Sequence, residues 1–157
     1  MGDVEIRLAR SDENETISEL ALRSKAYWGY SEDFLQACRV ELTYDSAVCG
    51  SGRMWVAVVG SSGSESSVVG FSVLGGEAPA GELTALFVDA SSIGTGCGRK
   101  LLEHTISEAR AQGFERLTLD ADPGAEPFYL HFGAVRIGTA VSGSIAGREL
   151  PRLEIVL

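Results

Sequence analysis

The fold is decided by residues 82–110, which read ELTALFVDASSIGTGCGRKLLEHTISEAR. Residues 82–88 are a dense β-type run and predict a strand that ends near Val88. The loop after it contains three glycines at alternate positions. A helix is predicted beyond the loop, because apolar residues recur there at helical spacing. These residues are Leu101, Leu102, Thr105, Ile106 and Ala109.

The loop has the properties of an anion site. Glycine lets the backbone approach a ligand closely, and the first turn of a helix carries unpaired N–H groups and about half a positive charge. Gly94, Gly96 and Gly98 therefore predict a phosphate site, with Arg99 and Lys100 at its rim. A tight strand-to-helix turn without a ligand is the structural alternative.

Two common phosphate loops fit this segment poorly. A Walker loop ends in Gly-Lys-Ser/Thr, whereas Gly98 is followed by Arg99 and Lys100. A dinucleotide loop has glycines at positions one, three and six near the start of a first βαβ unit. Here the glycines occupy positions one, three and five, behind a predicted antiparallel hairpin.

The flanking sequence supplies the other elements of the fold. Upstream we predict a strand over 4–8 and a helix from about 15 to 26, followed by a loop over 25–30. A second helix is predicted to start at Ser31 and to end near Leu42, and residues 43–53 are predicted to be irregular. Two β-runs joined by a Gly/Ser turn predict an antiparallel hairpin. After Gly113, which stops the long helix, come a fifth strand, a short helix closed by Gly133 and two last strands. The ranges from the hairpin onward are 54–60, 68–75, 116–121, 122–133, 134–141 and 151–156.

Composition favours one soluble globular domain spanning residues 1–157. The chain is 45% hydrophobic and 22% charged, and no apolar run approaches the ~20 residues of a membrane span. The N-terminal sequence lacks the apolar core of a signal peptide, so we expect a cytoplasmic protein. A net charge of −9 argues against nucleic acid and anionic membranes as partners.

Cysteine and histidine give no sign of a metal site. Cys38, Cys49 and Cys97 are odd in number and widely spaced, as reduced thiols are. His104 and His131 are too far apart in sequence to suggest a zinc cluster. We expect no metal, and we read Cys97 as a small filler residue.

Two segments resemble the GNAT superfamily of acetyl-CoA-dependent N-acetyltransferases. IGTGCG, residues 93–98, resembles the family's Gln/Arg-Gly-x-Gly-x-Gly/Ala loop at every glycine, with Ile93 in place of Gln or Arg. The family also has an Asn after its fifth strand and a short helix with Ala, an aromatic pair and Gly-Phe. That spacing resembles Asp122, Ala125, Phe128, Tyr129, Gly133 and Ala134.

The resemblance covers nearly the whole chain and implies a GNAT-like fold of the α/β (α+β) class. That fold has a mixed, mostly antiparallel sheet of about seven strands and about four helices. Their order is one strand, two helices, three strands, a helix, a strand, a helix and two strands. The implied reaction is direct transfer of an acetyl group from acetyl-CoA, as cosubstrate, to an amine.

The resemblance also implies which residues bind coenzyme A. Amides from Ile93 to Arg99 would hold the pyrophosphate. Backbone groups near Phe87 and Val88 would contact the pantetheine arm, lying in a gap between the fourth and fifth strands, and one would polarise the thioester carbonyl. The full cofactor-binding set is Phe87, Val88, Ile93, Gly94, Thr95, Gly96, Cys97, Gly98, Arg99 and Asp122.

Two side chains are candidates for proton transfer. Tyr129 would protonate the leaving thiolate, since a phenol with a pKa of about 10 can serve as general acid. A core aromatic is the alternative for Tyr129. Glu82 would accept the amine proton through water, and a solvated carboxylate at the end of a strand is its alternative.

The acceptor is an unidentified amine of a small molecule or peptide. By the resemblance, Trp28 and Tyr30 border its cleft, although Trp28 could equally fill the core. Two other functions stay open: a non-catalytic acyl-CoA-binding sensor or scaffold, and a flavin- or nucleotide-binding domain. A homodimer also stays open.

Overall fold

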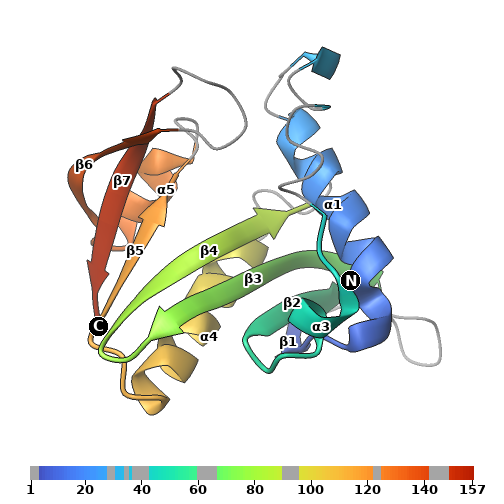
Figure 1. Cartoon of the computed structure of the whole chain (residues 1–157), viewed down its shortest axis with the longest axis horizontal. Helices are drawn as coiled ribbons and strands as arrows, with labels where there is room; N and C mark the ends of the chain where they lie inside the picture. The colour runs from blue at the N-terminus through green and yellow to red at the C-terminus, as the bar shows by residue number, and fades with distance from the viewer. Residues whose placement is uncertain are drawn as a thin grey trace.

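A seven-stranded mixed sheet runs through the molecule in the order β1-β2-β3-β4-β5-β7-β6 (Figure 1). Neighbouring strands pair antiparallel except β4 and β5, which are parallel. The predicted mixed, mostly antiparallel sheet is confirmed. The computed structural model describes residues 4–27, 31–33, 36, 43–59, 67–89, 96–121, 125–141 and 149–157.

All seven strands lie where the sequence predicts strands, within a few residues at each end. The predicted hairpin of β2 and β3 is confirmed. Their bounds are β1 Val4–Leu8, β2 Met54–Val59, β3 Ser67–Glu77, β4 Ala80–Val88, β5 Arg116–Asp120, β6 Val135–Val141 and β7 Glu149–Val156.

The helices agree with the prediction except at two places. The loop predicted over 25–30 is wrong in its first part, because α1 continues to Tyr27. The stretch 43–53 is not wholly irregular, because the Asp45 carboxylate accepts from the Val48 N–H (2.8 Å) and caps a short helix. The helices are η1 Ser11–Glu13, α1 Asn14–Tyr27, α3 Ser46–Cys49, α4 Cys97–Ala111 and α5 Glu126–His131.

Glycine stops both downstream helices as predicted. Gly113 follows α4 with φ +92°, and Gly133 follows α5 with φ +90°. Most of the second helix predicted over 31–42 lies outside the described residues.

The two faces of the sheet are covered by different helices. Ile17 and Leu20 of α1 are fully buried in one cluster with Phe71 of β3. On the opposite face, the buried Ser72 and Thr105 hydroxyls are hydrogen bonded (2.7 Å) and tie α4 to β3. Alternation along β3 separates these two contacts. Helix α1 therefore packs on one face and α4 on the other, as Figure 1 shows.

A partly buried ion pair fixes the start of α1 to β1. The Arg7 guanidinium donates to both Glu13 carboxylate oxygens (2.9 and 2.8 Å), and the Arg10 N–H donates to Oε1 (2.8 Å). The Glu13 side chain is only 9% exposed. Hydrogen bonding from Arg7 outweighs burial and lowers the pKa of Glu13 below its ordinary value.

We expect Glu13→Gln to lower the free energy of unfolding at neutral pH by about 2 kcal/mol, because a partly buried pair with charge-assisted hydrogen bonds is broken. A carboxyl with a depressed pKa stabilises the fold above its unfolded-state pKa and loses that contribution as pH falls through its folded-state pKa. The difference between wild type and variant should therefore shrink in acid. Urea unfolding from neutral to acidic pH measures it, with the exposed Glu15→Gln as control. A difference that does not change with pH would contradict this account.

Candidate functional site

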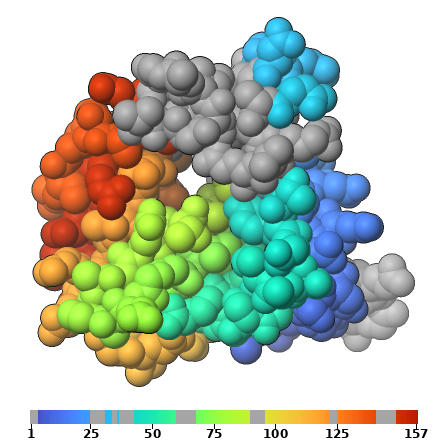
Figure 2. Space-filling model, in the orientation of Figure 1, coloured from blue at the N-terminus to red at the C-terminus, as the bar shows by residue number. Residues whose placement is uncertain are grey.

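Strands β4 and β5 pair at one end and separate at the other. Their ladder consists of three pairs, Ala80 with Arg116, Gly81 with Leu117 and Glu82 with Thr118. Beyond Glu82 the two strands diverge, and Figure 1 shows the opening between them. Figure 2 shows that the surface is hollowed between β4 and the part of the molecule formed by β5, α5 and β7. The gap lies between parallel neighbours in the centre of the sheet.

A β-bulge in β4 accounts for the separation. Val73 of β3 pairs with Ala85 and the next residue, Leu74, pairs with Leu83, so Thr84 is an extra residue on β4. The Thr84 hydroxyl donates to the Val73 carbonyl (3.3 Å) and fixes the bulge. A bulge bends its strand. Here it directs the second half of β4 away from β5.

The second half of β4 has backbone groups that face the gap. The Asp89 N–H donates to the Val69 carbonyl of β3 (2.7 Å). Bonded and non-bonded pairs alternate along an antiparallel ladder, so Phe87 also bonds to β3, whereas Leu86 and Val88 direct their N–H and C=O toward β5. Since β5 has diverged, these groups line the gap. Leu86 was missed at the level of sequence.

The start of α4 presents amides that the helix itself leaves unbonded. Gly96 has φ +88° and is exposed, and its carbonyl accepts the first helical bond, from the Lys100 N–H (3.0 Å). The amides of Cys97, Gly98 and Arg99 precede that bond and have no partner within the helix. The predicted strand–loop–helix order is confirmed, and the positive φ at Gly96 explains why glycine stands there.

Close contacts hold this first turn against β3, β4 and α5. A Cβ on Gly70 of β3 would lie 2.8 Å from Leu101 Cδ1 and 3.3 Å from Cys97 Sγ, so α4 packs directly on the glycine backbone. A Cβ on Gly98 would lie 3.4 Å from Val88 Cγ2 and 3.5 Å from Phe128 Cζ. Gly70 was also missed, although a glycine inside a strand is a signal of close backbone approach.

Cys97 is a packing residue, as predicted. Its side chain is fully buried, and burial raises the pKa of the thiol to about 11. We expect no alkylation of Cys97 by iodoacetamide in the native protein near pH 8, because almost no thiolate is present. Peptide mass mapping before and after urea unfolding tests this. Rapid labelling of native Cys97 would contradict the packing.

The two candidate proton-transfer residues lie on opposite faces of the sheet beside the gap. Tyr129 of α5 is 6% exposed and belongs to one buried cluster with Leu83 of β4 and Leu119 of β5. Glu82 is half-buried in the last β4–β5 pair, opposite Thr118. Because Glu82 adjoins Leu83, it faces the other side of the sheet from Tyr129. The two residues therefore flank the point where β4 and β5 begin to diverge, one on each face of the sheet.

Polar side chains continue along the Glu82 face. Arg152 of β7 donates to two side chains of the neighbouring strand β5, the Asp120 carboxylate (2.9 Å) and the Thr118 hydroxyl (3.4 Å). Arg99, predicted to add charge at the rim, is paired with Glu103 (2.8 Å).

Within the described part of the chain, no three His, Cys, Asp or Glu side chains are placed to hold a metal ion, and no helix is long and apolar enough to span a membrane.

The structure brings part of the predicted site together. Val88, Cys97 and Gly98 meet at the end of β4, whereas the Phe87 ring packs on Phe71 (5.5 Å between centroids) on the α1 face. Six predicted residues lie outside the described residues: Trp28, Tyr30, Ile93, Gly94, Thr95 and Asp122.

A known protein family matches most of this chain. A family model described as "Acetyltransferase (GNAT) domain" matches residues 16–143. No curated protein matches the sequence.

Solved structures share the fold along nearly the full chain. A GCN5-related N-acetyltransferase from Rhodopseudomonas palustris superposes with TM-score 0.76 at 21% identity, over 100% of this chain and 96% of that one. PaiA N-acetyltransferase from Thermoplasma acidophilum, in complex with coenzyme A, gives 0.72 at 20% identity, over 99% of each chain. Apo YjaB from Escherichia coli gives 0.70 at 26%, over 98% and 97%.

Proposed function

Because this chain belongs to the GNAT acetyltransferase family, we propose that it transfers an acetyl group from acetyl-CoA to the amine of a small molecule or peptide. One observation carries the proposal. The gap between the parallel strands β4 and β5 opens beside the amides at the start of α4 that have no partner within the helix. An extended chain ending in a diphosphate needs such a neighbouring pair of sites.

In the proposed complex, the diphosphate of coenzyme A accepts from the amides of Cys97, Gly98 and Arg99, at the positive end of the α4 dipole. The pantetheine arm lies along β4 and bonds to the gap-facing groups of Leu86 and Val88, as an added strand would. PaiA, crystallised with coenzyme A, shares this fold and supports coenzyme A as the ligand class.

The chemistry follows from the two faces of the gap. The amine approaches from the Glu82 face, and Glu82 accepts its proton through water. The amine nitrogen then attacks the thioester carbonyl carbon, and a β4 amide stabilises the charge that develops on oxygen. As the C–S bond breaks, Tyr129 on the opposite face donates its phenolic proton to the thiolate. The nitrogen loses its second proton, which restores the Tyr129 phenol through water, and Glu82 returns its proton to solvent, so the products are an acetylated amine, coenzyme A and one proton.

The decisive experiment measures release of the coenzyme A thiol from acetyl-CoA over a panel of primary amines, together with calorimetric titration of coenzyme A, ATP and FMN. The proposal expects binding of coenzyme A alone among the three, and turnover with at least one amine. Tight binding without turnover on any amine would favour the acyl-CoA sensor. Preference for ATP or FMN would overturn the proposed ligand.

A further inference from the structure

A carboxylate stands beside the proposed diphosphate site. Asp89 directly follows β4, and its backbone N–H bonds to Val69 of β3. The side chain of the preceding residue, Val88, packs against Gly98 of α4. A Cβ on Gly98 would lie 3.4 Å from Val88 Cγ2. With about 3.8 Å between consecutive Cα atoms, Asp89 lies within roughly 15 Å of the first amides of α4, on the α1 face of the sheet. That separation is well within the Debye length of about 30 Å at 0.01 M salt, so at low ionic strength the charge acts on an anion bound there.

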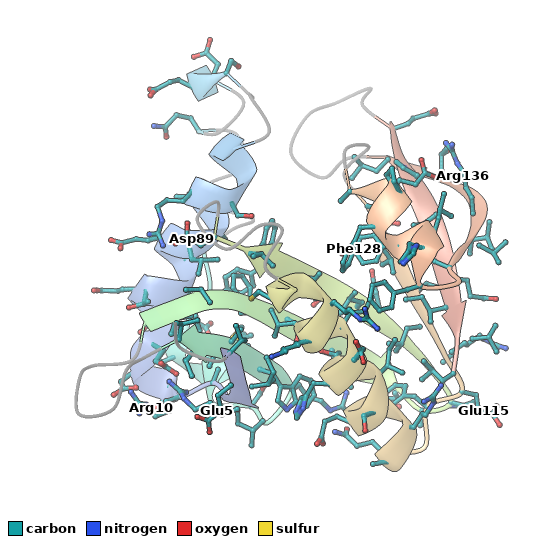
Figure 3. All side chains as sticks on the ribbon, turned by 180° about the vertical axis from the view of Figure 1, so that it is seen from behind. Glu5, Arg10, Asp89, Glu115, Phe128 and Arg136 are labelled. Atoms are coloured by element: carbon teal, nitrogen blue, oxygen red, sulfur yellow. The ribbon has the colours of Figure 1, made fainter. Side chains whose placement is uncertain are left out.

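Arg23 of α1 balances this charge. Its Nη2 lies 3.1 Å from Asp89 Oδ2, across 66 residues of sequence, and the Asp89 side chain is only 21% exposed. Figure 3 shows Asp89 between the end of β4 and α1. An unpaired carboxylate here would repel a diphosphate, and the guanidinium removes that repulsion.

We propose that Arg23 and Asp89 form a charge-balancing pair of the coenzyme A site, in which Arg23 is a positioning residue that acts through Asp89. The inference rests on the proposed function. The pair holds the end of β4 to α1, and the Arg23 guanidinium cancels the Asp89 charge near the α4 amides. Neither side chain is required to contact the ligand.

A double-mutant cycle that neutralises each charge tests the pair. Binding is measured by calorimetric titration of coenzyme A at low ionic strength, about 0.01 M. We expect Arg23→Gln to weaken binding about fivefold and Asp89→Asn to bind at least as tightly as wild type. The double variant R23Q/D89N should return to within about twofold of wild type, and Arg23→Lys should bind normally, since both keep the local charge balanced. Circular dichroism verifies that each variant is folded.

Two controls separate this electrostatic role from a structural one. The weakening in R23Q should nearly vanish at about 1 M salt, where the Debye length is about 3 Å. Arg10→Gln removes an exposed guanidinium that pairs with Asp12 (3.3 Å) and lies 3.9 Å from Glu13, near the other end of α1 and away from Asp89 in Figure 3, and should not change affinity.

Several results would overturn the inference alone: wild-type affinity in R23Q, a double variant as weak as R23Q, or a deficit that persists in high salt. A wild-type protein that binds no coenzyme A would overturn the proposed function and this inference with it.

Discussion

Tyr129→Phe is expected to lower kcat for acetyl transfer by about 100-fold or more, because the leaving thiolate loses its proton donor. The Kd for acetyl-CoA should stay within about twofold of wild type, since the ring that packs among Leu83 and Leu119 is retained. The measurement is steady-state kinetics with the best amine of the panel, alongside calorimetric titration of acetyl-CoA.

Tyr44→Phe is the matched control for loss of a tyrosine hydroxyl. Tyr44 is half-buried and its ring packs edge-on against Phe71 (5.2 Å between centroids) in the α1-side cluster, away from α5. The kcat of Tyr44→Phe should equal that of wild type. If Tyr129→Phe keeps full kcat, Tyr129 is a core aromatic and the general acid is another group. If both variants lose activity equally, the loss reflects stability.

Gly96→Ala is expected to weaken coenzyme A binding, whereas Gly98→Ala is expected to leave it nearly unchanged. Gly96 has φ +88°, a region that costs an alanine about 1–2 kcal/mol. Relief of that strain would move the amides of Cys97 and Arg99, so we expect Gly96→Ala to weaken coenzyme A by about tenfold or more.

Gly98→Ala should leave affinity within about twofold and raise stability slightly. The added Cβ would make ordinary contacts with Val88 and Phe128, directed into the protein, and alanine is the better helix former by about 1 kcal/mol. Calorimetry with coenzyme A and thermal unfolding measure both variants. Equal affinities for the two variants would show that the turn at Gly96 does not position the ligand.

Much of the fold could be predicted because local pattern and tertiary environment agree. Helix α4 was predictable from Leu101, Leu102, Thr105 and Ala109, which the structure buries, and from Gly113, which ends it. The strands were predictable because β-type runs are separated by glycine- and serine-rich segments. The family resemblance, now supported by the match over residues 16–143, supplied the topology.

The features missed depend on pairing between distant residues. The bulge at Thr84 is a property of the β3–β4 register, and the sequence of β4 alone does not reveal which residue is extra. Two ion pairs were also missed, Arg7 with Glu13 and Arg23 with Asp89. In the sequence these four residues cannot be distinguished from ordinary solvent-exposed charged residues. Tyr129 and Glu82 were found through the resemblance, and their chemical roles remain predictions.

The central claim is that main-chain amides at the start of α4 bind the diphosphate of coenzyme A. Titration of ¹⁵N-labelled protein with coenzyme A, followed by amide chemical shifts, tests it most directly. The account predicts the largest shifts at Cys97, Gly98 and Arg99, with further shifts at Leu86 and Val88 along the gap. Saturation with coenzyme A that leaves these five amides unshifted would contradict it.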